Sequence, residues 1–174
     1  MKRSVGLWQL IGFAVTSLAG TMLHFGYDLA GEAAWIAPFA GVNESTWEHM
    51  KLLFWPILLF AFLQSFFFRG YEAFWCVKLR GTLLGLVLIP VLFYTYNGVI
   101  GKSPDWVNIA IFFVSAAAVF FYETRLLNKE SFSCRSRRLA LGVLLLIAAL
   151  FVLFTFRTPR IGIFMDPLTG TYGI

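Results

Sequence analysis

Charged residues are scarce in this 174-residue sequence: Asp, Glu, Lys and Arg make up 13% of it, against about 25% in an ordinary soluble domain. Hydrophobic residues make up 59%, and the mean hydropathy is +0.77. A soluble domain of this size could not hide so much apolar surface, because small folded domains still expose much of their area. Two cysteines are too few for a disulfide-stabilised scaffold. We therefore expect an integral membrane protein that forms a single domain over residues 1–174.

Motifs of the common enzyme classes are also missing. The sequence contains no phosphate-binding loop, nucleophile elbow, dinucleotide fingerprint or haem-attachment motif. The 14 Lys and Arg residues, which bring the net charge to +5, are scattered in short segments between apolar runs. Such a distribution carries information about membrane topology, and it indicates no nucleic-acid partner.

Five apolar runs are each close to the roughly 20 residues that an α-helix needs to cross a bilayer. They cover approximately residues 5–27, 46–68, 74–96, 106–122 and 139–156. The runs are continuous rather than alternating, which favours helices over barrel strands. The first run follows Lys2-Arg3, as in a signal peptide, but it continues past Ala19, so we expect it to be retained as a helix. The predicted fold is an all-α integral membrane protein, a five-helix transmembrane bundle.

Basic residues are distributed unevenly between the two ends of these runs. With the N-terminus in the cytoplasm, ten Lys and Arg would lie on the cytoplasmic side and four on the outer side. The positive-inside rule therefore predicts a multi-pass protein of the cell membrane with a cytoplasmic N-terminus and an extracytoplasmic C-terminus. On this topology Cys76 and Cys134 face the reducing cytoplasm and are expected to remain thiols. Glu72, Glu123 and Arg125 are expected at solvated cytoplasmic helix ends.

The stretch between the first two runs, residues 33–42, is too apolar for a solvated loop and too short to span the membrane. It contains Trp35 and Phe39, and its Pro38 and Gly41 favour a turn. We expect a short re-entrant or interfacial segment whose aromatic side chains lie at headgroup depth. Irregular backbone at such depth is stable only where it packs in protein or lines a wet cavity.

The sequence Asn43-Glu-Ser-Thr-Trp-Glu-His-Met-Lys51 leads directly into the second apolar run. Ser45-x-x-Glu48 is a capping box, in which the Ser45 hydroxyl accepts from the Glu48 amide and the Glu48 carboxylate accepts from the Ser45 amide. Lys51 can pair with Glu48, which lies three residues earlier. One interpretation is therefore that these polar residues only start a helix.

A cap does not need Trp47 or His49, and Glu44 and Glu48 lie on a common face one turn apart. A further histidine, His24, lies near the outer end of the first run, and helices joined by a short connection are normally neighbours. We therefore predict one polar cluster at the outer membrane face, formed by His24, Glu44, Glu48 and His49. Such a cluster suits a divalent metal such as zinc, a metal-free proton or ligand site, or plain hydrogen-bonded packing. The sequence has no HExxH motif, so these three interpretations stay open.

Two segments resemble the pattern of a known family. One is Asn43-Glu-Ser-Thr-Trp-Glu-His49 with His24 before it, and the other is the ending Asp166-Pro-Leu-Thr-Gly-Thr-Tyr-Gly173. Both are similar to those of small bacterial integral membrane proteins catalogued as domain of unknown function 6512. The resemblance covers essentially the whole chain. It implies an architecture, but no reaction and no catalytic residue.

Asp166 begins the C-terminal motif, where Pro167 and Gly170 are typical of a tight turn. The tail that follows is too apolar to float freely, so we expect it to fold back over the outer mouth of the bundle. There Asp166 is a further ligand-binding candidate beside the His/Glu cluster. Asn97, near the outer end of the third run, is a candidate for lining the same cavity.

Three classes of function are compatible with these features. The preferred one is a membrane protein whose outward-facing polar pocket binds or transports a small ligand, an ion or a proton. The alternatives are a small membrane-embedded enzyme that depends on a metal or a His/Glu pair, and a structural or accessory subunit. A divalent metal is the cofactor that the residues suggest. Membrane lipid is the expected partner, and self-association into a homo-oligomer is left open.

Overall fold

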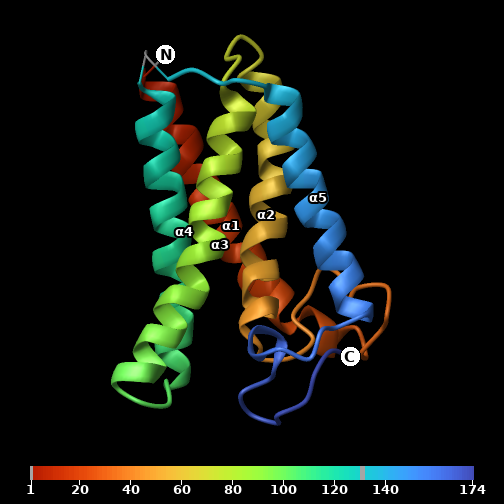
Figure 1. Ribbon diagram of the computed structural model, residues 1–174. Helices are drawn as coiled ribbons and strands as arrows, with labels where there is room; N and C mark the ends of the chain where they lie inside the picture. The colour runs from red at the N-terminus through yellow and green to blue at the C-terminus, as the bar shows by residue number, and fades with distance from the viewer. Residues whose placement is uncertain (1, 130–131) are drawn as a thin grey trace.

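The computed structural model describes residues 2–129 and 132–174, and within them the chain is all-helical. Its elements are α1 Lys2–Leu29, α2 Thr46–Phe67, α3 Phe74–Val99, α4 Asp105–Leu127, α5 Arg137–Phe156 and a short 3-10 helix, η1, Gly162–Phe164. The five long helices run side by side, with the N-terminus at one end of the bundle and the C-terminal tail at the other (Figure 1). Each is long and apolar enough to cross a membrane. The predicted five-helix architecture is confirmed.

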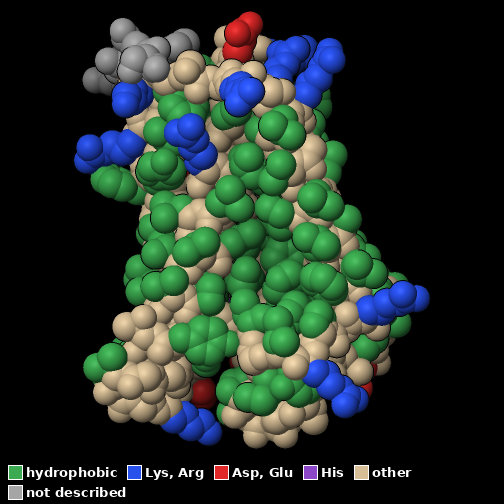
Figure 2. Space-filling view, in the orientation of Figure 1, with side chains coloured by type: hydrophobic (Ala, Val, Ile, Leu, Met, Phe, Trp, Pro, Cys, Tyr) green, Lys and Arg blue, Asp and Glu red, His purple; other side chains and the backbone are tan. Residues whose placement is uncertain are grey.

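Helix α2 is the central helix of the bundle. It contacts α1 and α3, and α3 in turn packs against α4 and α5. Leu53, Phe54 and Phe60 of α2 are almost completely buried, whereas the other four helices each leave a broad apolar side exposed. Figure 2 shows the result on one face: a wide hydrophobic zone nearly free of charged side chains, with Lys and Arg toward both ends. This is the surface that a lipid environment requires.

The segment between α1 and α2 consists of turns that pack against both helices. The Gly41 amide donates to the Leu23 carbonyl of α1 at 3.1 Å, and the Trp55 indole of α2 donates to the Pro38 carbonyl at 2.8 Å. The irregular backbone is thus covered by protein, as expected for a segment at this depth. Trp35, in contrast, is 71% exposed, which suits an aromatic side chain at a membrane–water boundary.

The two cysteines do not remain thiols, so that expectation is wrong. Cys76, near the start of α3, and Cys134, in the connection between α4 and α5, form a disulfide. Their Cα atoms are 5.8 Å apart, a usual separation for a bridged pair. The bridge ties α3 to the segment before α5 at the same end of the bundle as the N-terminus.

Glu123 does not lie at a solvated helix end, which corrects a second expectation. It is fully buried in α4, and its Oε2 accepts from the Lys78 ammonium of α3 at 2.6 Å. The ammonium also lies 5.7 Å and 5.4 Å from the ring centroids of Phe74 and Phe120. Gly81 provides the space, because a Cβ there would lie 2.5 Å from Glu123 Oε1. A carboxylate can be buried so deeply only when a partner of opposite charge accompanies it.

Candidate functional site

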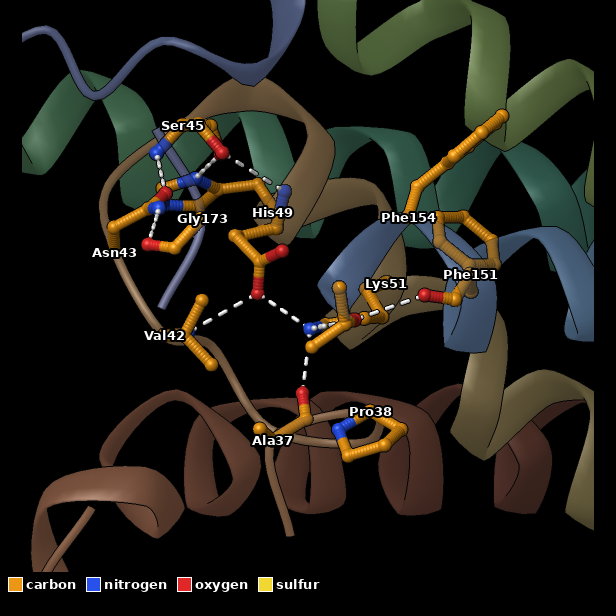
Figure 3. A network of polar contacts seen from close by, with 12 residues as sticks. Ala37, Pro38, Val42, Asn43, Ser45, His49, Lys51, Phe151, Phe154 and Gly173 are labelled. Atoms are coloured by element: carbon orange, nitrogen blue, oxygen red, sulfur yellow. Dashed lines mark hydrogen bonds and ion pairs between the residues drawn. The ribbon is translucent and has the colours of Figure 1, made fainter. Parts of the chain in front are cut away.

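Ser45 is the N-cap of α2, as predicted. It has extended backbone angles (φ −67°, ψ 152°), and its hydroxyl accepts from the Glu48 amide at 3.4 Å. The reciprocal half of the capping box is wrong. The Ser45 amide donates to Asn43 Oδ1 at 2.9 Å, and Glu48 Oε2 accepts from the Val42 amide at 3.0 Å (Figure 3). The Glu48 side chain therefore turns away from the cap and toward the segment before it.

The reason for this turn is Lys51, one helical turn further along α2. Its side chain is completely buried and forms an ion pair with Glu48 Oε2. The same ammonium donates to the Ala37 carbonyl at 2.7 Å and to Thr155 Oγ1 of α5 at 3.2 Å. Figure 3 shows Lys51 lying between Val42, Ala37 and α5. Because both charges are buried, they must pair. The Glu48–Lys51 pair thereby links α2 to the segment before it and to α5.

Glu44 lies immediately before the cap and meets both histidines of the chain. His24 Nε2, near the end of α1, is 3.6 Å from Glu44 Oε1, and His49 Nε2, in the first turn of α2, is 3.5 Å from Glu44 Oε2. Each residue offers one potential ligand atom, and these three atoms lie within 4.8 Å of one another. The three side chains are partly exposed. Of the four residues predicted to cluster, the structure brings together these three and places Glu48 in the adjacent Lys51 network.

The hydrogen bond of His49 determines which of its nitrogens carries a proton. Nδ1 lies 2.9 Å from the Ser45 carbonyl oxygen, and because a carbonyl can only accept, Nδ1 must be the donor. In a neutral imidazole Nε2 is then an acceptor. It faces the Glu44 carboxylate, which also only accepts. A second proton on His49, or a metal ion between the two residues, makes this contact attractive.

The His24, Glu44 and His49 side chains form one wall of a cavity of about 720 Å³. The cavity separates the ends of α1 and α2 from those of α3 and α4, which lean away from α2 in Figure 1. In Figure 2 a hollow opens at the lower end of the molecule, between the connection of α3 to α4 and the C-terminal tail. An acidic side chain is visible inside it. The polar residues Asn97, Ser103 and Asn108 belong to the opposite wall. They are linked, since the Ser103 amide donates to Asn97 Oδ1 at 2.9 Å and its hydroxyl donates to Asn108 Oδ1 at 2.8 Å.

Asp166 shapes the C-terminal tail. Its Oδ1 accepts from the Leu168 amide at 2.8 Å and its Oδ2 accepts from the Thr169 hydroxyl at 2.9 Å. Both oxygens thus hold the expected turn instead of facing the His/Glu residues. The tail does fold over the mouth of the bundle, because Leu168 lines the cavity and Asn43 Nδ2 donates to the Gly173 carbonyl at 3.2 Å.

Comparison with known protein families identifies the family of this chain. The model of the family of unknown function DUF6512 matches residues 1–174. The chain belongs to this family. No curated protein and no solved structure matches it. The resemblance carried by residues 43–49 and 166–173 is therefore confirmed.

Part of that site was missed from the sequence of this DUF6512 protein. Ser103 and Asn108 line the cavity and bond to each other, yet neither was predicted to contribute. A usable signal existed, because Asn97 and Asn108 flank a short connection between two antiparallel helices, whose facing ends must lie close together. The role of Trp47 was also missed: its ring packs 4.5 Å from Phe164 of η1, centroid to centroid.

Proposed function

We propose that this DUF6512 protein binds a divalent transition-metal ion in its membrane pocket, through His24, Glu44 and His49. The observation that carries the proposal is the 3.5 Å approach of His49 Nε2 to Glu44 Oε2. The Ser45 carbonyl holds the proton of His49 on Nδ1, so in the neutral imidazole two acceptor atoms face each other. A cation between them converts repulsion into coordination.

The separations of the ligand atoms also suit a small ion. Zinc binds imidazole nitrogen and carboxylate oxygen at about 2.0–2.2 Å, so two ligands of a tetrahedral site lie about 3.3 Å apart. The observed distances are 3.6 Å from Glu44 Oε1 to His24 Nε2 and 3.5 Å from Glu44 Oε2 to His49 Nε2, and one ligand atom from each of the three residues lies within 4.8 Å of the others. A ligating histidine commonly donates its other ring N–H to a backbone carbonyl, as His49 does to Ser45. Two imidazoles and one carboxylate favour zinc or a neighbouring first-row ion over magnesium or calcium.

Three protein ligands leave one coordination position for a further molecule, and all three side chains line the cavity. An open position distinguishes ligand-binding and catalytic zinc sites from closed structural ones. Binding of a ligand at the metal is thus the function that the geometry supports best. Metal-assisted hydrolysis is the second candidate, because the same position can hold a water molecule whose pKa the ion lowers. Transport has less support, since the sequence contains no inverted repeat.

Cobalt binding provides the test. His24 and His49 are the only histidines of the chain, so protein purified without a histidine tag should bind one equivalent of Co²⁺ with the visible absorption of a tetrahedral nitrogen/oxygen site. Glu44→Gln and His49→Gln should each weaken Co²⁺ binding by more than about 100-fold, since even outer partners of metal ligands contribute about 10–100-fold.

The matched control is Asp28→Asn, which removes an exposed carboxylate near the end of α1. This variant should bind Co²⁺ like the unaltered protein. If Asp28→Asn weakened Co²⁺ binding as much as Glu44→Gln does, the binding would reflect general negative surface charge, and the proposal would be refuted. Absence of Co²⁺ binding, together with a second proton on His49 in a nitrogen NMR titration, would assign the contact to a proton. Absence of both would favour the accessory-subunit interpretation.

We also propose that the N-terminus is cytoplasmic and that the metal site opens on the outer side, with membrane lipid around the bundle. The ten basic residues at one end against four at the other support this orientation. The Cys76–Cys134 disulfide opposes it, because it would lie at the cytoplasmic end, where disulfides are rare.

Accessibility labelling distinguishes the two orientations. In a Cys76→Ser/Cys134→Ser background, cysteine is introduced at Lys102 or at Ser133, which are exposed at opposite ends of the bundle. A membrane-impermeant maleimide should label Lys102→Cys in intact cells and Ser133→Cys only after permeabilisation. The reverse pattern would invert the topology and would place the disulfide in an oxidising compartment.

A further inference from the structure

The cavity reaches far below its polar mouth. Along α4 its lining residues extend from Asp105 to Phe113, about 12 Å at 1.5 Å per residue. Along α1 they extend inward as far as Gly20, about 14 Å from the end of that helix at Leu29. The hydrocarbon core of a bilayer is about 30 Å thick, so the inner part of the cavity lies at the depth of the acyl chains.

The inner part is apolar and is bordered by side chains on the lipid-facing surface. Leu52 and Phe112 close it on the bundle side. Ile109 and Phe113 of α4 also line it, and Phe25 of α1 lines the cavity at the level of His24, although these three side chains are 57%, 37% and 54% exposed. A wall made of exposed apolar residues from two membrane-spanning helices meets hydrocarbon rather than water. A ligand can therefore enter from the lipid between the outer parts of α1 and α4, above the level at which Gly20 packs against Phe112.

With the metal of the proposed function bound, the outer part of the cavity favours an anion. Lys102 lies on its rim and is exposed, and the Ser103 and Asn108 side chains lie beside it. The acid on the same rim, Asp105, lies in the first turn of α4, where its charge complements the helix dipole. On the opposite wall the divalent metal of the proposed function exceeds the charge of its ligand Glu44, so that wall becomes positive as well. An anionic group between the two walls would be attracted from both sides.

From this arrangement we infer that the cavity binds one single-chain membrane amphiphile with an anionic headgroup. The chain lies between α1 and α4 against Ile109 and Phe113, and the headgroup lies between Lys102 and the metal of the proposed function, on which the headgroup part of the inference rests. The volume of about 720 Å³ falls within the roughly 300–1,000 Å³ of pockets that enclose a small organic ligand. A carboxylate and a phosphate monoester share the required chemistry.

Native mass spectrometry of the full chain, released from detergent, tests the inference with palmitate, a lysophosphatidic acid and hexadecanol as probes. One palmitate or one lysophosphatidic acid should bind, and the preferred acid identifies the headgroup. Ile109→Trp, which fills the cavity, should lower binding of both acids by at least about tenfold, equivalent to 1.4 kcal/mol. The matched control Val114→Trp adds the same ring at a 55% exposed position of α4 outside the cavity and should leave binding unchanged.

Added zinc distinguishes the contribution of the headgroup to binding from that of the hydrocarbon chain. Adding Zn²⁺ should strengthen binding of palmitate but not of hexadecanol, and Lys102→Gln should weaken binding of palmitate alone. Absence of saturable binding, equal loss in Ile109→Trp and Val114→Trp, or the same zinc effect on the acid and the alcohol would overturn the inference. Co²⁺ absorption is measured on the same variants without amphiphile. If the protein gives a normal cobalt spectrum but binds no palmitate, only this inference is refuted. If it binds palmitate, Ile109→Trp blocks that binding, and no cobalt binds, only the proposed metal site is refuted.

Discussion

Replacing Lys78 by Met should lower the free energy of unfolding by about 3–5 kcal/mol, because it leaves the Glu123 carboxylate buried without its partner. The two side chains are 1% and 0% exposed, and Lys78 Nζ lies 2.6 Å from Glu123 Oε2. The other carboxylate oxygen, Oε1, has no hydrogen-bond partner among the described residues, so no neighbouring group takes over the role of the ammonium. In the double variant Lys78→Met/Glu123→Leu most of the loss should disappear, since apolar residues of similar volume often replace a buried ion pair without cost.

Reversible unfolding in mixed detergent micelles, carried out on both single variants and the double variant, measures the coupling between the two residues. Lys129→Met is the matched control, because this lysine is exposed just after α4, and its effect should stay within about 0.5 kcal/mol. A Lys78→Met variant as stable as the unaltered protein would show that the pair is not a desolvated ion pair. A double variant less stable than either single variant would show that the pair contributes more than apolar packing can.

Replacing Lys51 by Met should also lower the free energy of unfolding by about 3–5 kcal/mol, and it should weaken Co²⁺ binding as well. The Lys51 ammonium joins Glu48, the Ala37 carbonyl and the Thr155 hydroxyl. These contacts hold the segment before α2, and that segment carries Glu44. Loss of the ammonium should therefore loosen residues 31–45 and raise their hydrogen exchange, while leaving the exchange of α3 and α4 unchanged.

The double variant Lys51→Met/Glu48→Gln should recover less stability than the double variant at Lys78 and Glu123. The Lys51 ammonium donates to two groups besides its acid, and the buried Ala37 carbonyl would be left without its donor, a cost of about 1–3 kcal/mol. Glu32→Gln, at an exposed position of the same segment, is the control for hydrogen exchange. Full recovery in the double variant would show that the Lys51 contacts to Ala37 and Thr155 carry no net energy.

Much of the fold was predictable because it depends on local sequence. In a bilayer every backbone N–H and C=O must be bonded within the protein, so a continuous apolar run of about 20 residues has to be a helix. The start of α2 was predictable for a similar reason, since the Ser45 cap satisfies an amide three residues away. The position of His24 near the C-terminal end of α1 placed it at the level of the Glu44 and His49 segment without any knowledge of packing.

The different partners of the Glu44 and Glu48 carboxylates were not predictable from the sequence. Sequence spacing gives the angle between two side chains around one helix axis, but it does not say which neighbouring element each of them meets. Glu44 lies before the helix and turns toward His24 and His49, whereas Glu48 turns toward the buried ammonium of Lys51. The carboxylate that meets the two histidines and the carboxylate that pairs with the buried ammonium were thus distinguished only by their tertiary neighbours.

The sequence by itself determined the membrane location, the five helices, the cap of α2 and the level at which the histidines meet the acids, because each depends on composition or on residues close in the chain. Tertiary structure decided the Lys78–Glu123 pair, 45 residues apart, the Cys76–Cys134 disulfide, 58 residues apart, and the cavity between the α1–α2 and α3–α4 ends. These features depend on how helices are rotated and tilted against one another. That arrangement minimises the energy of the whole packed bundle and is not encoded in any one segment.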